Sequence, residues 1–394
     1  MTLKKALFTL FFPVIELQAL ILSLLLLAFR SKQKLRFIDT VIVKPDAIGD
    51  YVLFRNFLEL LHIDMRTDDG ATMLIGNIKC KDLAEECDTR FVDEFVWVDY
   101  DKLFNNAVIL NRYTIALVLT LRRYRFRRLL CPVYSRNYIV DRFIVKNCNA
   151  QCKVAMNGDN LNMPPFAKAI SDRFYTKLVE IDEDNIFEFY KNRAFFESIL
   201  DRKMSIEQLS FPDRVTCKFI PTKDYAVLFP GAGKVVRRWP TEKFAEIADY
   251  LISRYGYQII IAGSKADRKL AKAIIEKCLN REVIDLTGRT SLAELGAILR
   301  ESKLLVSNDT SAVHIAASVE ANTIFFLLGN NSFGRFGPYP PSFKNMHALY
   351  PLSIEMTDNN YHELAKRFKT FPRLKMRDIG VEKVKRLIEG TLQG

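Results

Sequence analysis

Short apolar runs alternate with longer segments of helical spacing along most of the chain, and this alternation limits the possible folds more than any other feature. Runs rich in β-branched residues predict buried strands at 37–43 (FIDTVIV), 73–78, 95–98, 115–121 (IALVLTL), 225–229 (YAVLF), 257–262, 283–286, 304–307 and 323–328. Helical spacing predicts helices between them, among others at 51–61, 291–299, 312–318 and 381–392. Continuous apolar strands that alternate with helices indicate parallel sheets covered on both faces.

The length predicts more than one domain. A chain of 394 residues is too long for one comfortable hydrophobic core. Its 49% apolar and 26% charged residues are typical of a folded globular protein and argue against disorder. We expect two doubly wound, Rossmann-like α/β domains that face a cleft. The predicted boundaries are a hydrophobic segment at 1–36, a first domain at 37–220, a second domain at 221–375 and a C-terminal helix at 376–394.

The N-terminal segment 6–29 is almost wholly apolar and is near the length of a membrane span. Pro13, Glu16 and Gln18 interrupt it, so a helix in the membrane interface or a shallow hairpin competes with a true span. A helix buried against the protein itself is the third possibility. Four cations follow the segment, at Arg30, Lys32, Lys34 and Arg36, whereas only Lys4 and Lys5 precede it. The positive-inside rule then predicts a protein on the cytoplasmic face of the inner membrane, associated through 6–29.

The formal net charge of +12 has a local component. Five arginines lie within one short stretch, at Arg122, Arg123, Arg125, Arg127 and Arg128. They form either a solvated helix face or a site for nucleic acid, anionic lipid or a phosphorylated substrate. Aromatic residues do not interleave with the arginines as a stacking platform requires, which argues against nucleic acid.

The seven cysteines are scattered and odd in number, which indicates reduced thiols rather than a disulfide framework. Cys148 and Cys152 have the spacing of metal ligands, but no second Cys or His pair lies nearby in the sequence. We therefore expect no bound metal.

Three loops follow predicted strands, where parallel sheets bind ligands. Pro230–Gly233 carries glycines that allow close backbone approach, and Arg237 precedes a helix for which Thr241 is the expected N-cap. After the strand 304–306, Asp309 or Thr310 is expected to cap a helix whose first N–H groups would bind a diphosphate. His314 lies one turn further on, where a histidine is more often a packing residue.

The first half has a comparable loop at 44–50 (KPDAIGD). A carboxylate in such a loop can act as a general base that takes the proton of an attacking hydroxyl. Asp50 is the preferred candidate, and Asp46 in the same loop is the second. A plain N-cap role for Asp50 is compatible with catalysis.

Three stretches in order resemble glycosyltransferase family 9, the heptosyltransferase-like enzymes of lipopolysaccharide core synthesis. They are 41–53 (VIVKPDAIGDYVL), 228–248 (LFPGAGKVVRRWPTEKFAEIA) and 285–318 (DLTGRTSLAELGAILRESKLLVSNDTSAVHIAAS), with 335–340 (RFGPYP) behind them. The resemblance implies a GT-B fold with the acceptor on the first domain and the nucleotide sugar on the second. It also implies inversion at the anomeric carbon without an obligatory metal.

Matched residue by residue, the resemblance gives Asp50 the position of the family's catalytic base. Arg237 falls on a contact to donor phosphate, and Asp309 on the acidic residue near the donor sugar. Thr310, Ser311 and Ala312 fall on the backbone phosphate cradle. Gly231 and His314 are added to the predicted donor side from their own loop and helix, not from the resemblance. Lys265 falls near a position where relatives have a Glu for the ribose, so the identity of the nucleotide stays open.

The sequence thus predicts an inverting glycosyltransferase that moves heptose or another hexose from a nucleotide-diphosphate donor to a lipopolysaccharide core or related glycolipid. The donor is a substrate, and no cofactor is expected. Charge and position suggest Arg123, Arg127 and Arg136 as contacts to a phosphorylated acceptor. The alternative is a non-catalytic protein that binds nucleotide sugars or glycans on the same fold.

Overall fold

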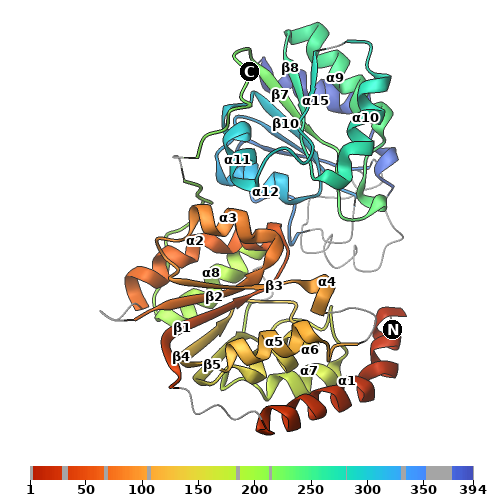
Figure 1. Cartoon of the computed structure of the whole chain (residues 1–394). Helices are drawn as coiled ribbons and strands as arrows, with labels where there is room; N and C mark the ends of the chain where they lie inside the picture. Colours follow the sequence, from red (N-terminus) through yellow and green to blue (C-terminus); the bar gives the residue numbers. More distant parts are fainter. Residues whose placement is uncertain are drawn as a thin grey trace. The chain divides into compact units, whose positions relative to one another are not determined.

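The computed structural model describes residues 3–28, 34–65, 70–103, 108–182, 187–212, 215–280, 282–329, 334–351 and 375–393 (Figure 1). The chain forms two compact units. Unit 1 comprises residues 1–183 and 191–204, and unit 2 comprises residues 184–190 and 205–394. Each unit contains one six-stranded parallel sheet, so the predicted pair of doubly wound sheets is confirmed.

The sheet of unit 1 has the order β3-β2-β1-β4-β5-β6. Its strands are β1 Arg36–Lys44, β2 Thr72–Asn77, β3 Glu94–Val98, β4 Tyr124–Cys131, β5 Ala150–Met156 and β6 Lys177–Val179. Every pairing is parallel. The chain leaves β1 toward β2 and later returns to the other side of β1 with β4. The carboxyl end of β1 is therefore the topological switch point, the usual place for a ligand.

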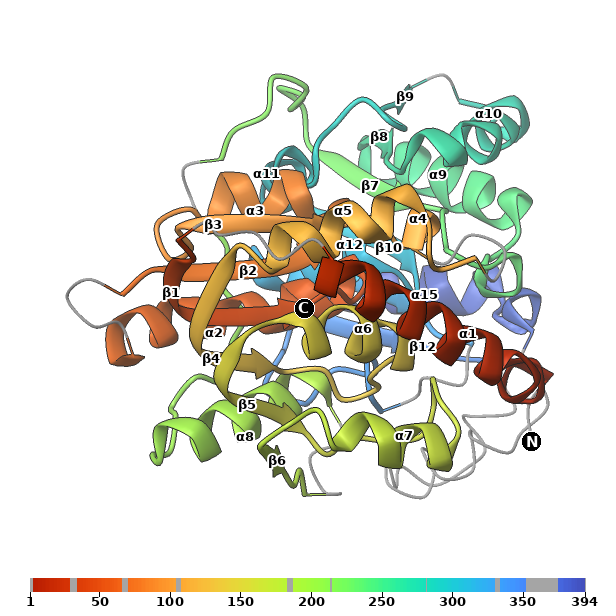
Figure 2. The same ribbon diagram turned by 60° about the horizontal axis from the view of Figure 1, so that its bottom comes forward.

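Helices cover both faces of this sheet (Figure 1). On one face lie α2 Ile48–Met65, α3 Lys81–Cys87 and α8 Glu188–Leu200. On the other lie α5 Arg112–Leu121, α6 Tyr138–Phe143 and α7 Pro165–Asp172. The short α4 Tyr100–Leu103 follows β3. The N-terminal helix α1 Leu3–Ala28 packs on the α6 and α7 side in both ribbon views (Figures 1 and 2).

One predicted strand of unit 1 is wrong. The run at 115–121 belongs to α5, whose N-cap Asn111 accepts a hydrogen bond from the Thr114 N–H (3.0 Å). Periodicity does not distinguish a buried strand from a buried helix in an apolar run of seven residues. Here the N-cap hydrogen bond of Asn111 favours the helix. The next strand is β4, which carries Arg125, Arg127 and Arg128. One interpretation of the sequence placed the arginine cluster on a solvated helix face. That interpretation is wrong, because three of the five arginines lie on β4.

The sheet of unit 2 has the order β12-β11-β10-β7-β8-β9. Its strands are β7 Tyr225–Phe229, β8 Gln258–Ile261, β9 Val283–Asp285, β10 Leu304–Asn308, β11 Ile324–Leu327 and β12 Met346–Leu349. All pairings are again parallel. The chain passes from β7 to β8 on one side and reaches β10 on the other. The switch point thus lies between the carboxyl ends of β7 and β10.

Among the described residues, five helices of eight or more residues pack on this second sheet. One face carries α9 Thr241–Tyr255, α10 Arg268–Lys277 and α15 Val381–Leu392, and the other carries α11 Leu292–Glu301 and α12 Ser311–Ser318 (Figure 1). Ser291 and Glu294 form a capping box at the start of α11, because each side chain accepts a hydrogen bond from the other residue's backbone N–H. Thr241 is not the N-cap of α9. Pro240 takes that position, and its carbonyl accepts from the Phe244 N–H.

Candidate active site

In unit 2, one buried amide joins the loops that the sequence singled out. The Asn308 side chain at the end of β10 donates to the Pro230 carbonyl (2.8 Å) and accepts from the Trp239 N–H (3.0 Å). Arg238 adds two bonds to the Ala232 carbonyl, at 3.2 and 3.0 Å. The loop after β7, the segment before α9 and the end of β10 therefore form a single cluster at the switch point. Sequence reasoning missed Asn308, although it stands beside Asp309.

Asp309 and Arg237 meet in this cluster. Their side chains form an ion pair of 3.7 Å between Arg237 Nη1 and Asp309 Oδ2. Asp309 is buried, and among the described residues its Oδ2 accepts no hydrogen bond. Burial raises the pKa of this carboxyl to about 6, and the charge of Arg237 only partly opposes the rise. The pair offers an acceptor for a hydroxyl and a cation for a phosphate.

The start of α12 adds main-chain donors to the same cluster. Thr310 occupies the N-cap position, but its side chain makes no capping hydrogen bond. The first N–H groups of the helix, from Ser311 and Ala312, therefore lack that side-chain partner. N–H groups at a helix start, with the positive end of the helix dipole, favour a bound anion. Thr310, Ser311 and Ala312 thus lie beside Asp309, at the end of β10 where a diphosphate was expected.

His314 is buried one turn into α12 and contacts Tyr339 rather than open space. Its Nδ1 lies 2.6 Å from the Tyr339 hydroxyl. Burial lowers the pKa of His314 to about 4, so the imidazole is neutral at pH 7. Burial, with the charge of Asp309 as a second cause, raises the pKa of Tyr339 well above its ordinary value. His314 is therefore placed as a positioning residue for Tyr339, which lies in the RFGPYP segment (335–340).

Gly231 is required by a neighbouring side chain. A Cβ at this position would lie 2.6 Å from Asp267 Oδ2. Asp267 is itself fixed by the Ser264 N–H (2.9 Å) and hydroxyl (2.7 Å). Lys265 is exposed in the short 3-10 helix Lys265–Asp267. The donor-binding roles of Gly231 and Lys265 stay predictions, and Asp267 is a buried acid that sequence reasoning missed.

In unit 1, Asp50 lies in the first turn of α2, directly after the carboxyl end of β1. Its side chain is half-buried. Asp46 in the same loop forms an ion pair of 2.9 Å with Lys44, a fully buried lysine that also donates to the Pro132 carbonyl (2.8 Å). Lys44 thus holds the competing carboxylate in a structural contact. This geometry favours Asp50 over Asp46 as a base.

The helix that carries Asp50 is fixed from the next residue onward. Tyr51 donates to Asp88 Oδ2 (2.7 Å), and Arg55 forms two bonds to the same carboxylate, at 2.6 and 3.1 Å. All three side chains are buried. Burial raises the pKa of the nearby Cys80 thiol to about 12, and the negative charges of Asp50 and Asp46 add to the rise. Asp50 at the start of α2 and Asp46 in the loop before it therefore both lie close to Cys80.

Two of the arginines proposed as acceptor contacts, Arg123 and Arg127, lie away from the edge of the sheet that carries Asp50. Arg123 directly precedes β4 and Arg127 is the fourth of its eight residues, whereas Asp50 follows the carboxyl end of the neighbouring β1. An eight-residue strand is about 26 Å long, so Arg123 lies at the opposite edge of the sheet and Arg127 about midway. Arg136 is buried and forms ion pairs with Asp141 (3.3 Å) and Asp172. The acceptor roles stay predictions, without support from these positions.

The described residues contain no group of three or more His, Cys, Asp or Glu side chains that could hold a metal ion. Cys148 is buried, and Cys152 is exposed on β5.

The chain is similar to known proteins in sequence and in fold. Residues 185–363 match the model of "Glycosyltransferase family 9 (heptosyltransferase)". Lipopolysaccharide heptosyltransferase 3 of Escherichia coli is 30% identical over 104 residues, which are 26% of this chain and 30% of the relative. Lipopolysaccharide heptosyltransferase 1 of Pseudomonas aeruginosa is 28% identical over 156 residues, 39% of this chain and 41% of the relative. The matched segments thus span less than half of either curated relative.

Two solved structures share the fold over nearly the whole chain. The glycosyl transferase family 9 protein of Veillonella parvula has a TM-score of 0.66 at 19% identity and covers 92% of this chain and 99% of its own. The E. coli heptosyltransferase WaaC with ADP also has a TM-score of 0.66, at 17% identity, covering 90% and 100%. The predicted two-sheet fold is in accord with both comparisons, and the predicted N-terminal apolar helix is present in the structure as α1.

Proposed function

We propose that the chain is a member of glycosyltransferase family 9 and an inverting glycosyltransferase that uses a nucleotide-diphosphate sugar. The donor carries heptose or another hexose, and the acceptor is a lipopolysaccharide core or a related glycolipid. Heptosyltransferases among the relatives act on lipopolysaccharide by name, and the E. coli structure contains ADP. We place the reaction on the cytoplasmic face of the inner membrane, with membrane association through residues 6–29.

The observation that carries this proposal is the Asn308-centred cluster of unit 2. It brings Arg237, the buried Asp309 and the start of α12 to one switch point. In a sugar transfer, negative charge grows on the departing diphosphate. A guanidinium and helix N–H groups stabilise that charge where it develops. The orphaned Asp309 oxygen, which needs a hydrogen-bond donor, suits a hydroxyl of the bound sugar.

Asp50 is the proposed general base. It takes the proton of the acceptor hydroxyl as that oxygen attacks the anomeric carbon and the bond to the diphosphate breaks. Proton transfer of this kind contributes roughly 10²–10⁴-fold to a rate. The proposed mechanism does not include a metal ion. Arg237 and the main-chain N–H groups of α12 would stabilise the negative charge of the leaving diphosphate. A non-catalytic binding protein is not favoured, since all of the relatives named above are transferases.

The first experiment identifies the donor. Thermal unfolding with ADP-, GDP- and UDP-sugars should show one nucleotide class that stabilises the protein, because a ligand of the native state raises its stability by mass action. Equal and negligible shifts with all three classes would argue against a nucleotide-sugar site.

The second experiment tests the base. Asp50→Asn should lower transfer by roughly 10²–10⁴-fold and leave the Kd of the donor nearly unchanged. Asp46→Asn is the matched control in the same loop, because Lys44 already holds that carboxylate. Near-normal turnover by Asp50→Asn, or a larger loss with Asp46→Asn, would reject Asp50 as the base.

A further inference from the structure

Helix α1 has two apolar faces, of which unit 1 covers only one. The covered face packs into the core of the unit through Phe8, Phe12, Ile15, Ala19, Leu22 and Leu26. The other face follows helical spacing and is exposed, through Leu7, Leu10, Phe11, Val14, Leu17, Leu20, Ile21, Leu24 and Leu25. Leu10 is 71% exposed and Leu24 58%. Soluble proteins rarely expose a continuous apolar stripe of this length, which marks an interaction surface.

Two polar residues in the middle of α1, Glu16 and Gln18, contact the rest of unit 1. Glu16 accepts from the Tyr138 hydroxyl (2.6 Å) and forms an ion pair with Arg142 (2.9 Å). Burial acts to raise the pKa of Glu16, but the hydrogen bonds from Arg142 and Tyr138 bring it below its ordinary value. Gln18 Oε1 accepts from the N–H groups of Ile109 (2.7 Å) and Leu110 (2.8 Å). These contacts hold the middle of α1 against unit 1.

The same contacts oppose a spanning helix. The stretch Ala6–Leu27 is long and apolar enough to cross a bilayer by length and composition. Crossing would remove Glu16 and Gln18 from their partners. It would also carry a carboxylate into hydrocarbon, at a high cost in free energy. Arg142 would lose its partner as well. With α1 on the protein, only apolar side chains of the outer stripe need an apolar environment.

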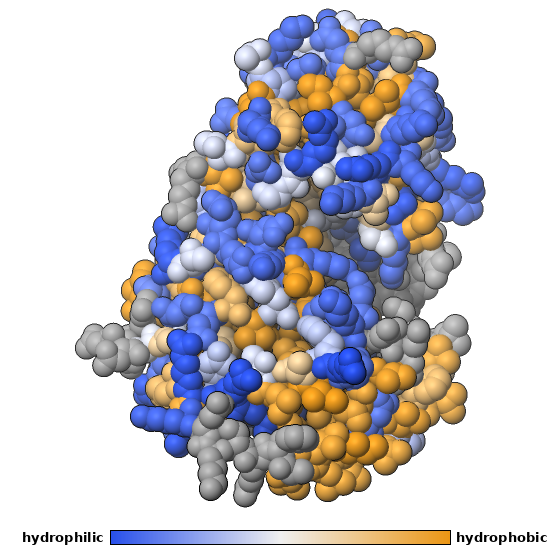
Figure 3. Space-filling model, in the orientation of Figure 1, coloured by the Kyte–Doolittle hydropathy of each residue, from blue (hydrophilic) through white to orange (hydrophobic). Residues whose placement is uncertain are grey.

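A group of exposed cations, called the border cations below, lies at the start of β1 and on the amino half of β4. At the end that leads from α1 into β1 lie Lys34, Arg36, Arg123, Arg125 and Arg127. The Arg36 N–H bonds the Arg123 carbonyl (2.9 Å), so the start of β1 and the turn before β4 are adjacent. Figure 3 shows the apolar side chains gathered around α1 at the lower end of unit 1, with hydrophilic residues around them. An apolar stripe with basic borders is complementary to an anionic lipid surface.

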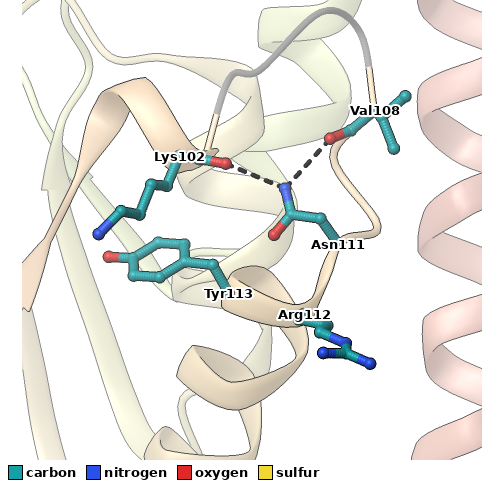
Figure 4. A pocket seen from close by; sticks show the side chains of 5 residues that line it. All are labelled: Lys102, Val108, Asn111, Arg112 and Tyr113. Carbon is teal, nitrogen blue, oxygen red and sulfur yellow. Dashed lines mark hydrogen bonds between the residues drawn. The ribbon is translucent and has the colours of Figure 1, made fainter.

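A basic pocket lies where Gln18 contacts the main chain of unit 1. It has a volume of about 390 Å³ and is lined by Lys102, Val108, Asn111, Arg112 and Tyr113 (Figure 4). Asn111 fixes its wall through bonds to the carbonyls of Lys102 (2.9 Å) and Val108 (3.2 Å). Arg112 is exposed. The pocket adds Lys102 and Arg112 as cations beside the main-chain segment that Gln18 of α1 contacts.

We propose that α1 is an in-plane anchor that lies in the interface of an anionic phospholipid bilayer without crossing it. The outer stripe enters the boundary between headgroups and acyl chains, while the inner face stays on unit 1. The 26 residues give about 39 Å of helix parallel to the surface. The border cations bind lipid phosphates. The cluster at the amino edge of the sheet, far from Asp50, thereby gains a function that the transfer reaction does not give it.

Vesicle flotation of the full chain tests the occupant. The probes are vesicles of pure phosphatidylcholine and vesicles of phosphatidylcholine with roughly 30% phosphatidylglycerol. Binding to each is measured over a series of salt concentrations. The variant Leu10→Ser/Leu17→Ser/Leu24→Ser should lower binding at least about 50-fold, because three exposed leucines lose the apolar contact that the bilayer would give them. Arg123→Glu/Arg125→Glu should lower binding to anionic vesicles about fivefold or more per residue and leave binding to neutral vesicles nearly unchanged.

Matched controls lie on unit 2. Leu279→Ser removes an exposed leucine, and Lys269→Glu/Lys272→Glu reverses two exposed cations of α10. Both should bind vesicles like the wild type. Equal losses in the controls, or no loss in the stripe variant, would overturn the proposal. If light scattering in the absence of lipid shows a dimer that the stripe variant abolishes, the occupant is a second copy, and the proposal is also wrong.

The orientation needs a separate arm. An epitope tag on the N-terminus should resist protease added to intact spheroplasts and be cut only after lysis, because an in-plane helix keeps both ends on the cytoplasmic side. Cleavage in intact spheroplasts would show a span and reject the in-plane anchor. This inference rests on the membrane association through residues 6–29 that is part of the proposed function. None of these readouts uses transfer activity, so a failure of the in-plane anchor is distinguishable from a failure of the proposed transfer reaction.

Discussion

Asp309 and His314 belong to one buried cluster of unit 2, and they should make its stability depend on pH with opposite signs. The folded protein raises the pKa of Asp309 from 3.8 to about 6, so it holds a proton more tightly than the unfolded chain does. Asp309 therefore favours folding at low pH, and this contribution is lost as the pH rises from about 4 to 6. The folded protein lowers the pKa of His314 from 6.5 to about 4. Its contribution is complete above 6.5 and is lost as the pH falls toward 4.

The magnitudes follow from linkage. One pKa unit corresponds to about 1.4 kcal/mol, so each group accounts for roughly 3 kcal/mol across its window. The two windows overlap between about pH 4 and 6, where the contributions nearly cancel in the wild type. Asp309→Asn removes the contribution that decreases with rising pH. The free energy of unfolding of this variant, relative to wild type, should therefore rise by up to roughly 3 kcal/mol between pH 4 and 7. His314→Gln should show a relative change of similar size and opposite sign.

The tryptophans allow this to be measured for unit 2 alone. Trp239 is buried there, and Trp97 lies on β3 of unit 1, so a Trp97→Phe background leaves one reporter. Urea unfolding followed by its fluorescence gives the free energy of unfolding at each pH. Subtracting the parent curve removes every other titrating group. A difference for Asp309→Asn that stays constant within about 0.5 kcal/mol from pH 4 to 7 would refute the buried environment of this carboxyl.

Two further predictions use the same fluorescence readout. Asn308→Ala should destabilise unit 2 by about 2–4 kcal/mol and weaken nucleotide binding in calorimetry, because a buried N–H and a buried carbonyl lose their partner; unchanged stability and Kd would contradict the clustering role. Gly231→Ala should cost about 1–3 kcal/mol because its Cβ would overlap the Asp267 carboxylate. Gly233→Ala is the matched control, since a Cβ there meets nothing within 4 Å, and an equal effect in both would exclude the overlap as the cause.

The sequence predicted most strands because parallel strands are buried on both faces and therefore appear as continuous apolar runs. β7 and α15 have the predicted ends. The failure at 115–121 has a physical reason: α5 is short and half-buried, and β4 begins with exposed arginines that hide its strand character. The exposed amino half of β4 does not show the pattern of a buried strand.

The chemistry was visible where it depends on neighbours in the sequence. Asp50, Arg237 and Asp309 stand in loops whose position after a strand is itself predictable. Asn308 was missed because its role depends on Pro230 and Trp239, which are 78 and 69 positions away. Lys44 was missed for the same reason, since its partner Pro132 is 88 positions distant. No local pattern encodes such contacts.

The two carboxylate–cation pairs of the switch points differ in one property that separates structure from function. Lys44 is fully buried beside Asp46 and is also bound to a carbonyl, so it cannot turn to another partner without leaving a charge unpaired in the interior. Arg237 is 31% exposed and approaches Asp309 only to 3.7 Å, longer than a hydrogen bond. A guanidinium in that state has donors to offer a phosphate at little cost. The loose pair is therefore the one suited to bind a ligand, and the tight pair is the one suited to hold the loop beneath Asp50.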